Sequence, residues 1–302
     1  RDGSLSDRDR GIAAVTIVVA ITFVALATSS NMGDYFSFPA FTLGVAGVVA
    51  AVHRRGGRLA RGAAVVAVLA ASANLVLVGR NKERADDEAA RVAERVGIIA
   101  TAIAADVATA EGCDAVISGT VKAFGGADIL INNAGTGSNE TIAEADDAKW
   151  QYYWDLHVMA AVRLARGLVP TMKQRGGGVV LHNASICAVQ PLWYEPIYNT
   201  TKAALMMFSK TLANEVVGDN IRVNTINPGL VLTPDWIKTA RQIAGDDGWE
   251  AHLQSVADEA GGMKRFATPE ELANFFVFMC SDKASYSTGS TYFVDGGWLR
   301  TV

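Results

Sequence analysis

The sequence predicts an α/β fold in which helices cover both faces of a doubly wound parallel sheet. From residue 73 onward, short apolar runs rich in Val and Ile alternate with longer amphipathic segments, which is the pattern of successive β-α-β units. The short runs are almost continuously apolar, as expected for strands that are buried on both faces. We therefore predict a single domain over residues 43–302, preceded by an atypical apolar segment over residues 1–42.

The individual elements follow from this alternation in chain order. Six apolar runs are predicted to be strands: Asn74–Val78, Ile98–Ala102, Ile129–Asn132, Val179–His182, Ile221–Ile226 and Thr291–Val294. The amphipathic segments between them are predicted to be helices: Glu83–Arg95, Glu111–Ala123, Asp146–Arg175, Pro196–Val217 and Pro269–Ser281. The last helix has a clear start, because Thr268 provides a capping hydroxyl and Pro269 stands at the first helical position. The polar segment Thr233–Gly262, which contains several glycines, is predicted to be an inserted lid.

The first residues permit three interpretations. Ile12–Thr28 is an apolar run of about the shortest length that can cross a bilayer, and a second apolar run covers Phe36–Val52. This region is a membrane segment or signal remnant, a buried segment, or a stretch that departs from the ancestral sequence. The charges before the first run cancel and leave no positive flank, so we favour a cytoplasmic protein over a membrane-attached one.

Composition excludes several functional classes. The chain is 50% hydrophobic and 19% charged, which excludes disordered and fibrous proteins. Its formal net charge of −4 provides no basic surface for nucleic acid. The three cysteines, Cys113, Cys187 and Cys280, are widely spaced, so we predict reduced thiols and no metal site. A small molecule is the expected partner.

One segment combines residue types that suit proton transfer. Tyr198 and Lys202 lie four residues apart in a predicted helix, so both side chains fall on one face. A tyrosine has an unperturbed pKa of about 10, and a nearby positive charge would lower it, which is what an acid/base tyrosine needs. Ser185 follows a buried strand, thirteen residues before Tyr198. Ligands of such sheets bind outside the carboxyl ends of the strands, so Ser185 is expected to donate a hydrogen bond to the oxygen that Tyr198 protonates.

The strand, Ser185, Tyr198 and Lys202 together resemble the active-site segment of short-chain dehydrogenases/reductases, and in particular 3-oxoacyl reductases. Further landmarks of that family occur in the same order over about residues 73–298. The resemblance implies a Rossmann-like domain that binds a nicotinamide dinucleotide, with contacts from Asp106, Val107, Asn133, Ala134, Gly135, Tyr198, Lys202, Pro228, Gly229, Val231 and Thr233. In the family Asp106-Val107 would lie beside the adenine, and the turn Pro228-Gly229 would contact the nicotinamide end.

The chain departs from the family pattern at two places. The family usually has an asparagine in the helix before Ser185, where this chain has His157. A histidine can also relay a proton, whereas simple packing of the ring is the alternative. The family begins with a glycine-rich turn that brings backbone amides close to a pyrophosphate.

The nearest match to that glycine-rich turn is GGRLARG, in which the small residues are Gly56, Ala60 and Gly62. A basic loop after an apolar segment is the alternative interpretation. We favour the phosphate turn, because the strand Asn74–Val78 needs a neighbouring strand and the apolar run ending at Val52 would supply it.

Arg80 predicts the choice of coenzyme. It follows the second strand of the family pattern, where a carboxylate would bind the ribose 2′-hydroxyl of NAD and repel a 2′-phosphate. An arginine there favours NADP (NADPH) over NAD, because a guanidinium pairs with a phosphate. A solvent-exposed arginine at a strand end is the alternative.

The sequence therefore predicts an oxidoreductase that interconverts a ketone and a secondary alcohol by hydride transfer, with catalytic residues Ser185, Tyr198, Lys202 and His157. Two rivals remain: a catalytically silent dinucleotide-binding or scaffold protein, and a membrane-anchored enzyme. The resemblance implies a homo-oligomer, either a tetramer or a dimer. Trp193, Tyr194 and Met206 suggest an apolar substrate, although such residues more often only pack.

Overall fold

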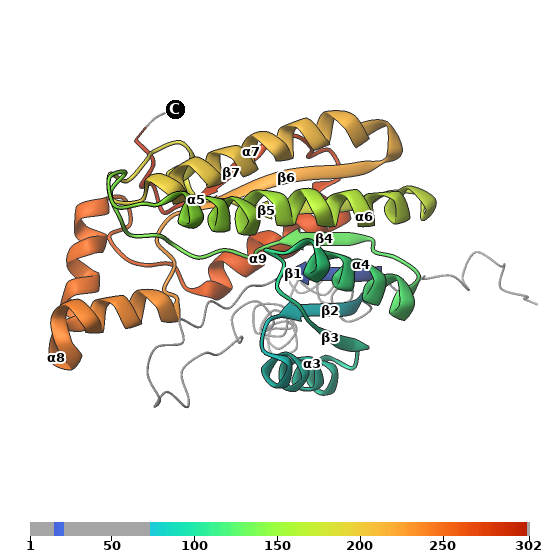
Figure 1. Cartoon of the computed structure of the whole chain (residues 1–302), viewed down its shortest axis with the longest axis horizontal. Helices are drawn as coiled ribbons and strands as arrows, with labels where there is room; N and C mark the ends of the chain where they lie inside the picture. The colour runs from blue at the N-terminus through green and yellow to red at the C-terminus, as the bar shows by residue number, and fades with distance from the viewer. Residues whose placement is uncertain (1–14, 21–72, 301–302) are drawn as a thin grey trace, which may run out of the picture.

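The computed structural model describes residues 15–20 and 73–300. Seven strands form one sheet in the order β3-β2-β1-β4-β5-β6-β7, and every neighbouring pair is parallel (Figure 1). The strands are β1 (Val15–Ala20), β2 (Ala73–Gly79), β3 (Ala100–Ala104), β4 (Ile129–Asn132), β5 (Gly178–Asn183), β6 (Ile221–Pro228) and β7 (Thr291–Val294). The predicted parallel sheet is confirmed, and all six predicted strands are present.

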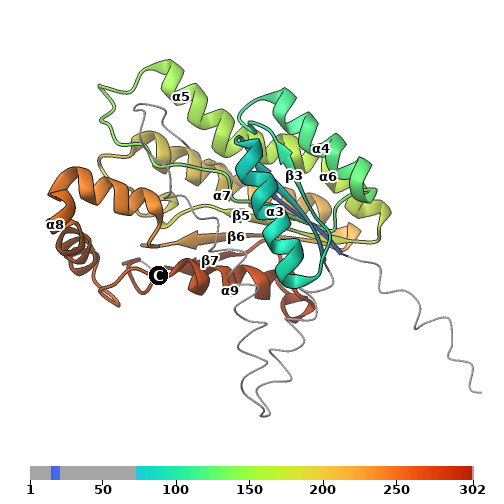
Figure 2. The same ribbon diagram turned by 90° about the horizontal axis from the view of Figure 1, so that it is seen from below.

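Alternate residues of the strands face opposite sides of the sheet and contribute to two cores. Val76, Val180 and Val223 belong to the core that includes α4 (Ala110–Phe124), α6 (Ala160–Gln174) and α7 (Pro196–Val216). Leu77, Leu181 and Ile226 belong to the core that includes α3 (Lys82–Val96) and α9 (Pro269–Cys280). Figure 2 shows α4 and α6 on one side of the strands and α9 on the other. Burial on both faces explains why the strands are almost continuously apolar.

The predicted helix Asp146–Arg175 is present in three successive parts. These are α5 (Asp147–Trp154), a π-helical turn η2 (Asp155–Met159) and α6. Such turns place one extra residue in a helix and occur frequently at functional sites. The turn contains His157, one of the predicted catalytic residues.

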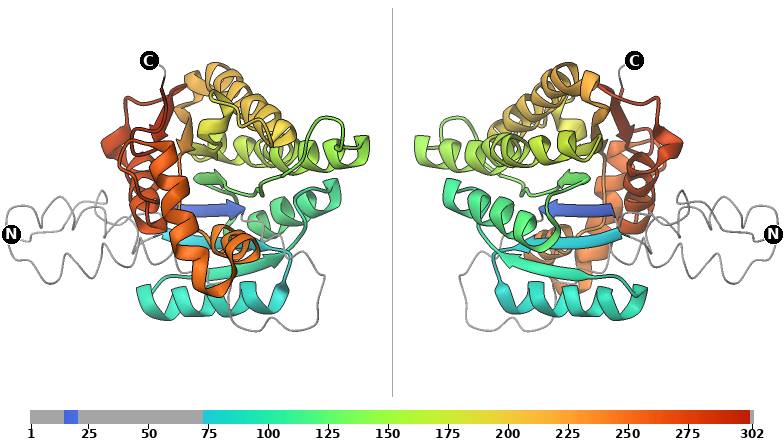
Figure 3. Two further views of the ribbon diagram at one scale, coloured as in Figure 1. Left: turned by 90° about the vertical axis from the view of Figure 1, so that its left-hand side faces the viewer. Right: turned by 90° about the vertical axis from the view of Figure 1, so that its right-hand side faces the viewer.

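The segment that was predicted to be a polar lid is helical and forms α8 (Pro234–Ala260). Its backbone leaves helical geometry at Gly245, where φ is 74° and ψ is 177°. Few of its residues are buried, so its apolar positions form no clear stripe in the sequence, which is why the helix was missed. Because α8 follows β6, it stands at the carboxyl-end edge of the sheet, as the left view of Figure 3 shows.

The apolar N-terminal run contributes a strand to the centre of the sheet. β1 takes Val15–Ala20 from this run and pairs with both β2 and β4. The predicted domain began at residue 43 and so left out β1, which lies at the centre of the sheet. A short apolar run is compatible with a buried strand as well as with a membrane segment, and the sequence alone does not distinguish the two. The rest of residues 1–42 and the run ending at Val52 lie outside the described residues. Within residues 15–20 and 73–300, no helix is both long enough and apolar enough to span a bilayer.

Candidate active site

The parallel strands bring most of the predicted site residues to one edge of the sheet. All strands run in the same direction, so their carboxyl ends meet there, and doubly wound sheets bind ligands at this edge. The residues that end or follow β2 to β6 in turn are Arg80, Asp106, Asn133, Ser185 and Pro228.

Ser185, Tyr198 and Lys202 converge at this edge. The Oγ of Ser185 accepts a hydrogen bond from the backbone N–H of Cys187 at 3.1 Å, which leaves the hydroxyl proton of Ser185 free to donate. Tyr198 lies in the first turn of α7, close enough to Ser185 for the Ser185 hydroxyl to act on the pKa of the phenol. One turn later, the Nζ of Lys202 lies 5.4 Å from the centre of the Tyr198 ring. Nζ also donates to the carbonyl of Asn183 at 2.9 Å.

Burial dominates the protonation of these groups. The pKa of Tyr198 is raised above its ordinary value, first by burial and then by Cys187 and Glu195, while the hydrogen bond with Ser185 opposes the shift. Burial lowers the pKa of Lys202 to about 8. The predicted lowering of the Tyr198 pKa by Lys202 is therefore not found, because loss of hydration outweighs the effect of charge. At neutral pH Tyr198 is a protonated phenol, and most Lys202 side chains carry a proton.

His157 is buried and held at both ring nitrogens. Its Nε2 accepts from the backbone N–H of Thr136 at 3.3 Å, and its Nδ1 lies 2.8 Å from the hydroxyl of Thr201. That hydroxyl donates to the carbonyl of Ile197 at 2.9 Å, so it accepts from His157 and the ring proton belongs to Nδ1. Burial, followed by the charge of Lys202, holds the pKa of His157 well below its ordinary value. The ring is therefore neutral at physiological pH.

Gly135 allows the chain to pass close to both His157 and Lys202. A Cβ at this position would lie 3.1 Å from the Nζ of Lys202 and 3.2 Å from the Nε2 of His157. Next to it, Asn133 accepts a hydrogen bond from the side chain of Asn183 at 2.6 Å. The turn after β4 is thus built against the groups that surround Tyr198.

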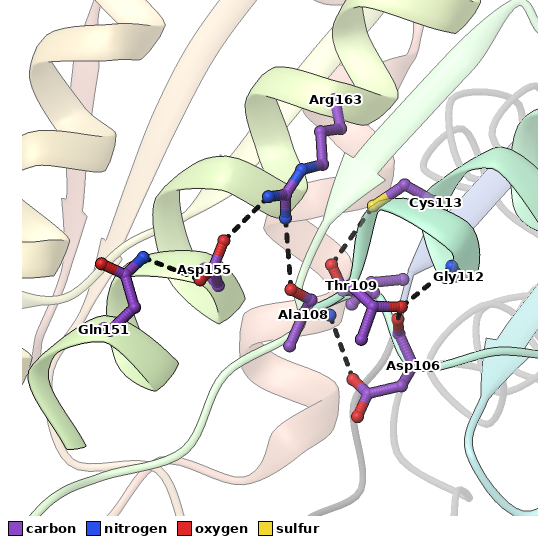
Figure 4. Close-up of polar contacts among 9 residues, drawn as sticks. Asp106, Ala108, Thr109, Gly112, Cys113, Gln151, Asp155 and Arg163 are labelled. Carbon is purple, nitrogen blue, oxygen red and sulfur yellow. Dashed lines mark hydrogen bonds and ion pairs between the residues drawn. The ribbon is translucent and has the colours of Figure 1, made fainter. Parts of the chain in front are cut away.

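The turn after β3 is braced by its own side chains (Figure 4). One carboxylate oxygen of Asp106 accepts from the backbone N–H of Ala108 at 3.0 Å. Arg163 reaches from α6 and donates to the carbonyl of Ala108 at 3.2 Å and to Asp155 at 2.9 Å (Figure 4). Buried Val107 contributes its carbonyl, which lies 3.2 Å from the Sγ of Cys113. Asp106 therefore has a structural role in its own turn.

Gly112→Ala should destabilise the protein by about 1–3 kcal/mol, which is the usual cost of overpacking. An added Cβ would lie 1.9 Å from the backbone oxygen of Asp106, so α4 and the turn must move apart. The better helix propensity of alanine offsets only about 1 kcal/mol. Urea unfolding measures the change, with Gly218→Ala as control because a Cβ there meets nothing within 4 Å. Equal stability of both variants would show that the contact relaxes freely.

The turn after β6 combines tight packing with an unpaired polar atom. A Cβ on Gly229 would lie 2.8 Å from the Cα of Asp295, so this position must be small. Val231 forms a parallel bridge with Ala267, and Thr233 caps α8. The buried Oδ1 of Asn227 has no hydrogen-bond partner among the described residues. The edge thus retains a polar atom that a bound ligand could satisfy.

Comparison with known proteins decides the family. The family model described as enoyl-(acyl carrier protein) reductase matches residues 59–299. Dehydrogenase/reductase SDR family member 4 from Bos taurus is 34% identical over 239 residues, which cover 79% of this chain and 83% of that protein. The chain belongs to the short-chain dehydrogenase/reductase family. It is accordingly an oxidoreductase, as the sequence predicted.

Two solved structures resemble this short-chain dehydrogenase/reductase over nearly its whole length. L-sorbose reductase from Gluconobacter frateurii, complexed with NADPH and L-sorbose, is 55% identical with a TM-score of 0.79, and the match covers 95% of this chain and 98% of that one. The 3-ketoacyl-(acyl-carrier-protein) reductase from Brucella melitensis, complexed with NADH, is 27% identical with a TM-score of 0.67. That match covers 93% of this chain and 98% of the other.

The residues present at the edge are compatible with a dinucleotide. Gly135 has no side chain, so a ligand can approach its backbone closely. The unpaired Oδ1 of Asn227 can accept a hydrogen bond from the ligand. Gly56, Ala60 and Gly62, the predicted phosphate turn, lie outside the described residues. No three His, Cys, Asp or Glu side chains gather into a metal site in the part of the chain that the structure describes.

Sequence reasoning missed several residues that the fold brings to the site. Thr136 and Thr201 fix the His157 ring, and Asn183 binds Lys202 through its carbonyl. Thr201 stands between Tyr198 and Lys202 in the sequence, but nothing in the sequence indicated that it contacts the His157 ring. Glu195 lies three residues before Tyr198, and that proximity was the one available signal.

Proposed function

We propose that this short-chain dehydrogenase/reductase reduces a ketone to a secondary alcohol with NADPH, and that Tyr198 donates the proton. The observation that carries the proposal is the convergence of three groups: the Nζ of Lys202 lies 5.4 Å from the centre of the Tyr198 ring, and the Ser185 hydroxyl acts on the phenol. The raised pKa of Tyr198 keeps the phenol protonated at neutral pH, which is the state needed to protonate a carbonyl oxygen.

Each side chain has a separate role in this proposal. Ser185 donates its hydroxyl proton to the carbonyl oxygen and holds it against Tyr198, since its Oγ already accepts from the backbone. Lys202 stabilises the phenolate that forms and binds a ribose hydroxyl of the coenzyme. The bound dinucleotide supplies the hydride to the carbonyl carbon. His157 is a positioning residue, because its ring contacts Tyr198 edge-on at a centroid distance of 5.6 Å and stays neutral.

The coenzyme is proposed to lie along the carboxyl-end edge. Arg80 would pair with the 2′-phosphate, and the 55% identical L-sorbose reductase, which was solved with NADPH, supports NADP over NAD. The residues proposed to contact the rest of the dinucleotide are Asp106, Val107, Asn133, Ala134, Gly135, Pro228, Gly229, Val231 and Thr233. Gly56, Ala60 and Gly62 remain the proposed pyrophosphate turn, although the strands beside β2 are β1 and β3 and not the run ending at Val52 that first suggested this turn.

The same relative supports a sugar-like ketone as substrate. At 55% identity over 98% of that chain, a keto sugar of the L-sorbose type is a better-supported substrate than a 3-oxoacyl thioester. We retain the proposal that the protein is a homo-oligomer, which sedimentation would test.

Titration with NADPH, followed by turnover assays with L-sorbose and simple ketones, tests the function. Saturable binding and substrate-dependent loss of NADPH absorbance are expected. Binding without turnover of any ketone would instead establish the catalytically silent protein that the sequence left open.

His157→Asn should remove part of the acid sensitivity of folding. The pKa of His157 is lowered in the folded protein. Below about pH 6.5 the unfolded chain therefore binds a proton at this residue, whereas the native ring remains neutral. Native stability therefore falls with decreasing pH by up to about 1.4 kcal/mol per pH unit on account of this residue, and the variant loses that slope. His182, whose pKa burial lowers to about 3, is unchanged in both proteins and cancels.

Urea unfolding of wild type and His157→Asn at several pH values provides the measurement. His157 should contribute nothing to the pH profile of turnover between about pH 5.5 and 7.5, because the ring does not titrate there. Turnover should fall in the variant without a shift of that profile. Parallel stability curves for the two proteins would contradict a neutral buried ring.

A further inference from the structure

A carboxylate that the proposed proton transfer does not use lies beside Tyr198. Glu195 comes directly before α7, and its Oε2 lies 4.0 Å from the Sγ of Cys187. A Cβ on Gly137 would lie 3.3 Å from its Oε1. Its charge also acts on Tyr198. Glu195 therefore lies where the loop after β4, the turn after Ser185 and the start of α7 come together.

This carboxylate has no strong donor among the described residues. Its one hydrogen bond there is to the thiol of Cys187, which is a weak donor. Burial, followed by repulsion from Glu140, raises the pKa of Glu195 to about 7. A carboxyl group that loses water without gaining donors is costly, so a partner from outside the chain would stabilise it.

Two further polar groups on the adjoining loop are buried without a partner. Glu140 is 7% exposed, and although one of its oxygens pairs with Lys149, its Oε1 has no partner among the described residues. Ser138 is 4% exposed, and its Oγ is likewise unpaired within that part of the chain. The backbone N–H of Glu140 donates to the carbonyl of Tyr194 at 3.0 Å, so this loop runs beside Glu195. Unsatisfied polar groups thus gather beside Glu195.

We propose that Glu195, supported by Glu140, is a specificity-determining residue that accepts hydrogen bonds from the hydroxyl groups of a polyhydroxylated ketone. This inference rests on the proposed function and adds the residues that distinguish its substrates. Hydroxyl groups next to the carbonyl supply the donors that Glu195 and the Oε1 of Glu140 lack. A hydrocarbon ketone or a 3-oxoacyl chain has no hydroxyl group there and would leave the acceptors unpaired. Trp193, which suggested an apolar substrate, is 81% exposed.

The test compares two ketones with the same carbon chain. L-sorbose and 2-hexanone both have six carbons and a carbonyl at carbon 2, and only the sugar carries hydroxyl groups. Hydrogen bonds to charged groups are worth about 1.5–3 kcal/mol, so in assays at about pH 8, where most Glu195 side chains are ionised, Glu195→Gln should lower kcat/KM for L-sorbose by about tenfold to a hundredfold. The value for 2-hexanone should change by less than about threefold, because Tyr198 and Ser185 are intact. Glu195→Leu should show the same loss for L-sorbose.

Glu215→Gln is the matched control, since Glu215 is exposed near the far end of α7, and it should change kcat/KM for neither ketone. An equal loss of kcat/KM for both ketones would overturn the inference, because Glu195 would then act through Tyr198 and would not bind the hydroxyl groups of the substrate. A wild-type preference for 2-hexanone would also overturn it, while leaving the proposed reductase function intact. Glu195→Gln is isosteric, so the test survives if the leucine variant fails to fold.

Failure of the proposed function itself has a different result. In that case no ketone consumes NADPH, and calorimetric titration of the NADPH-treated protein with L-sorbose replaces the kinetic test. Weaker binding in Glu195→Gln than in Glu215→Gln would support the acceptor role. Equal affinity in the two variants would overturn it.

Discussion

Tyr198→Phe should lower kcat for ketone reduction by about 100-fold to 10,000-fold, which is the usual contribution of a general acid. The substitution removes the hydroxyl on which Ser185 acts and keeps the ring that lies edge-on to His157. Because the pKa of Tyr198 is raised, the wild-type phenol carries its proton throughout the neutral range. The loss should therefore appear at every pH from about 6 to 8. Steady-state assays with a saturating ketone and NADPH measure it.

The control for this variant is Tyr286→Phe, since Tyr286 is fully exposed. It should retain wild-type turnover. Thermal melting of Tyr198→Phe should show a cooperative transition close to that of wild type, which separates chemistry from folding. If Tyr198→Phe keeps a large share of wild-type turnover, the assignment of the proton donor is wrong.

Arg80→Asp should lower kcat/KM for NADPH by at least about tenfold to a hundredfold. A guanidinium can bind a 2′-phosphate through two charge-assisted hydrogen bonds, and the aspartate both removes these and adds repulsion. Arg80 is only half-buried and follows the last residue of β2 at the carboxyl-end edge of the sheet. Activity with NADH should fall less, or rise, because the new carboxylate can accept from the ribose hydroxyls.

Parallel kinetics with both coenzymes test this expectation. Arg95→Asp, an exposed arginine at the other end of α3, controls for the change of net charge. Lys82 is close to Arg80 in the sequence and could contribute to the 2′-phosphate site, although it pairs with Asp86. Such a contribution would make the loss in Arg80→Asp smaller but would not reverse it. A wild-type preference for NADH, or an equal loss with both coenzymes, would remove Arg80 from the 2′ site.

The sequence alone was sufficient for the sheet from β2 to β7 and for the family. Strands that are buried on both faces leave a continuous apolar run, and this local pattern located β4 and β7 to the residue. The pairing of Tyr198 with Lys202 could be predicted because helix periodicity places residues four apart on one face. Ser185 could be added because it follows a buried strand. Tyr198 and Lys202 do lie on the same side of α7, with the Nζ 5.4 Å from the ring centre.

Two elements were not identified from the sequence alone: β1 was one of three interpretations left open for its apolar run, and α8 was not among the predicted helices. The apolar run that contains β1 has the composition of a membrane segment, and only its pairing with β2 and β4 distinguishes the two. α8 buries few residues and contains the break at Gly245, so no helical stripe marked it as a helix. For β1 the deciding contacts are with residues far away in the chain.

The chemistry of the site depended on the tertiary structure most of all. The sequence identified Tyr198 and His157 as titratable groups, but the raised pKa of the phenol and the lowered pKa of the imidazole both come mainly from burial. Glu195 could not be recognised before the fold placed it against Cys187 and near Glu140. Sequence periodicity determines which side chains share a face, whereas hydration and charge at a site depend on every segment that packs around it, and only the folded chain brings those segments together.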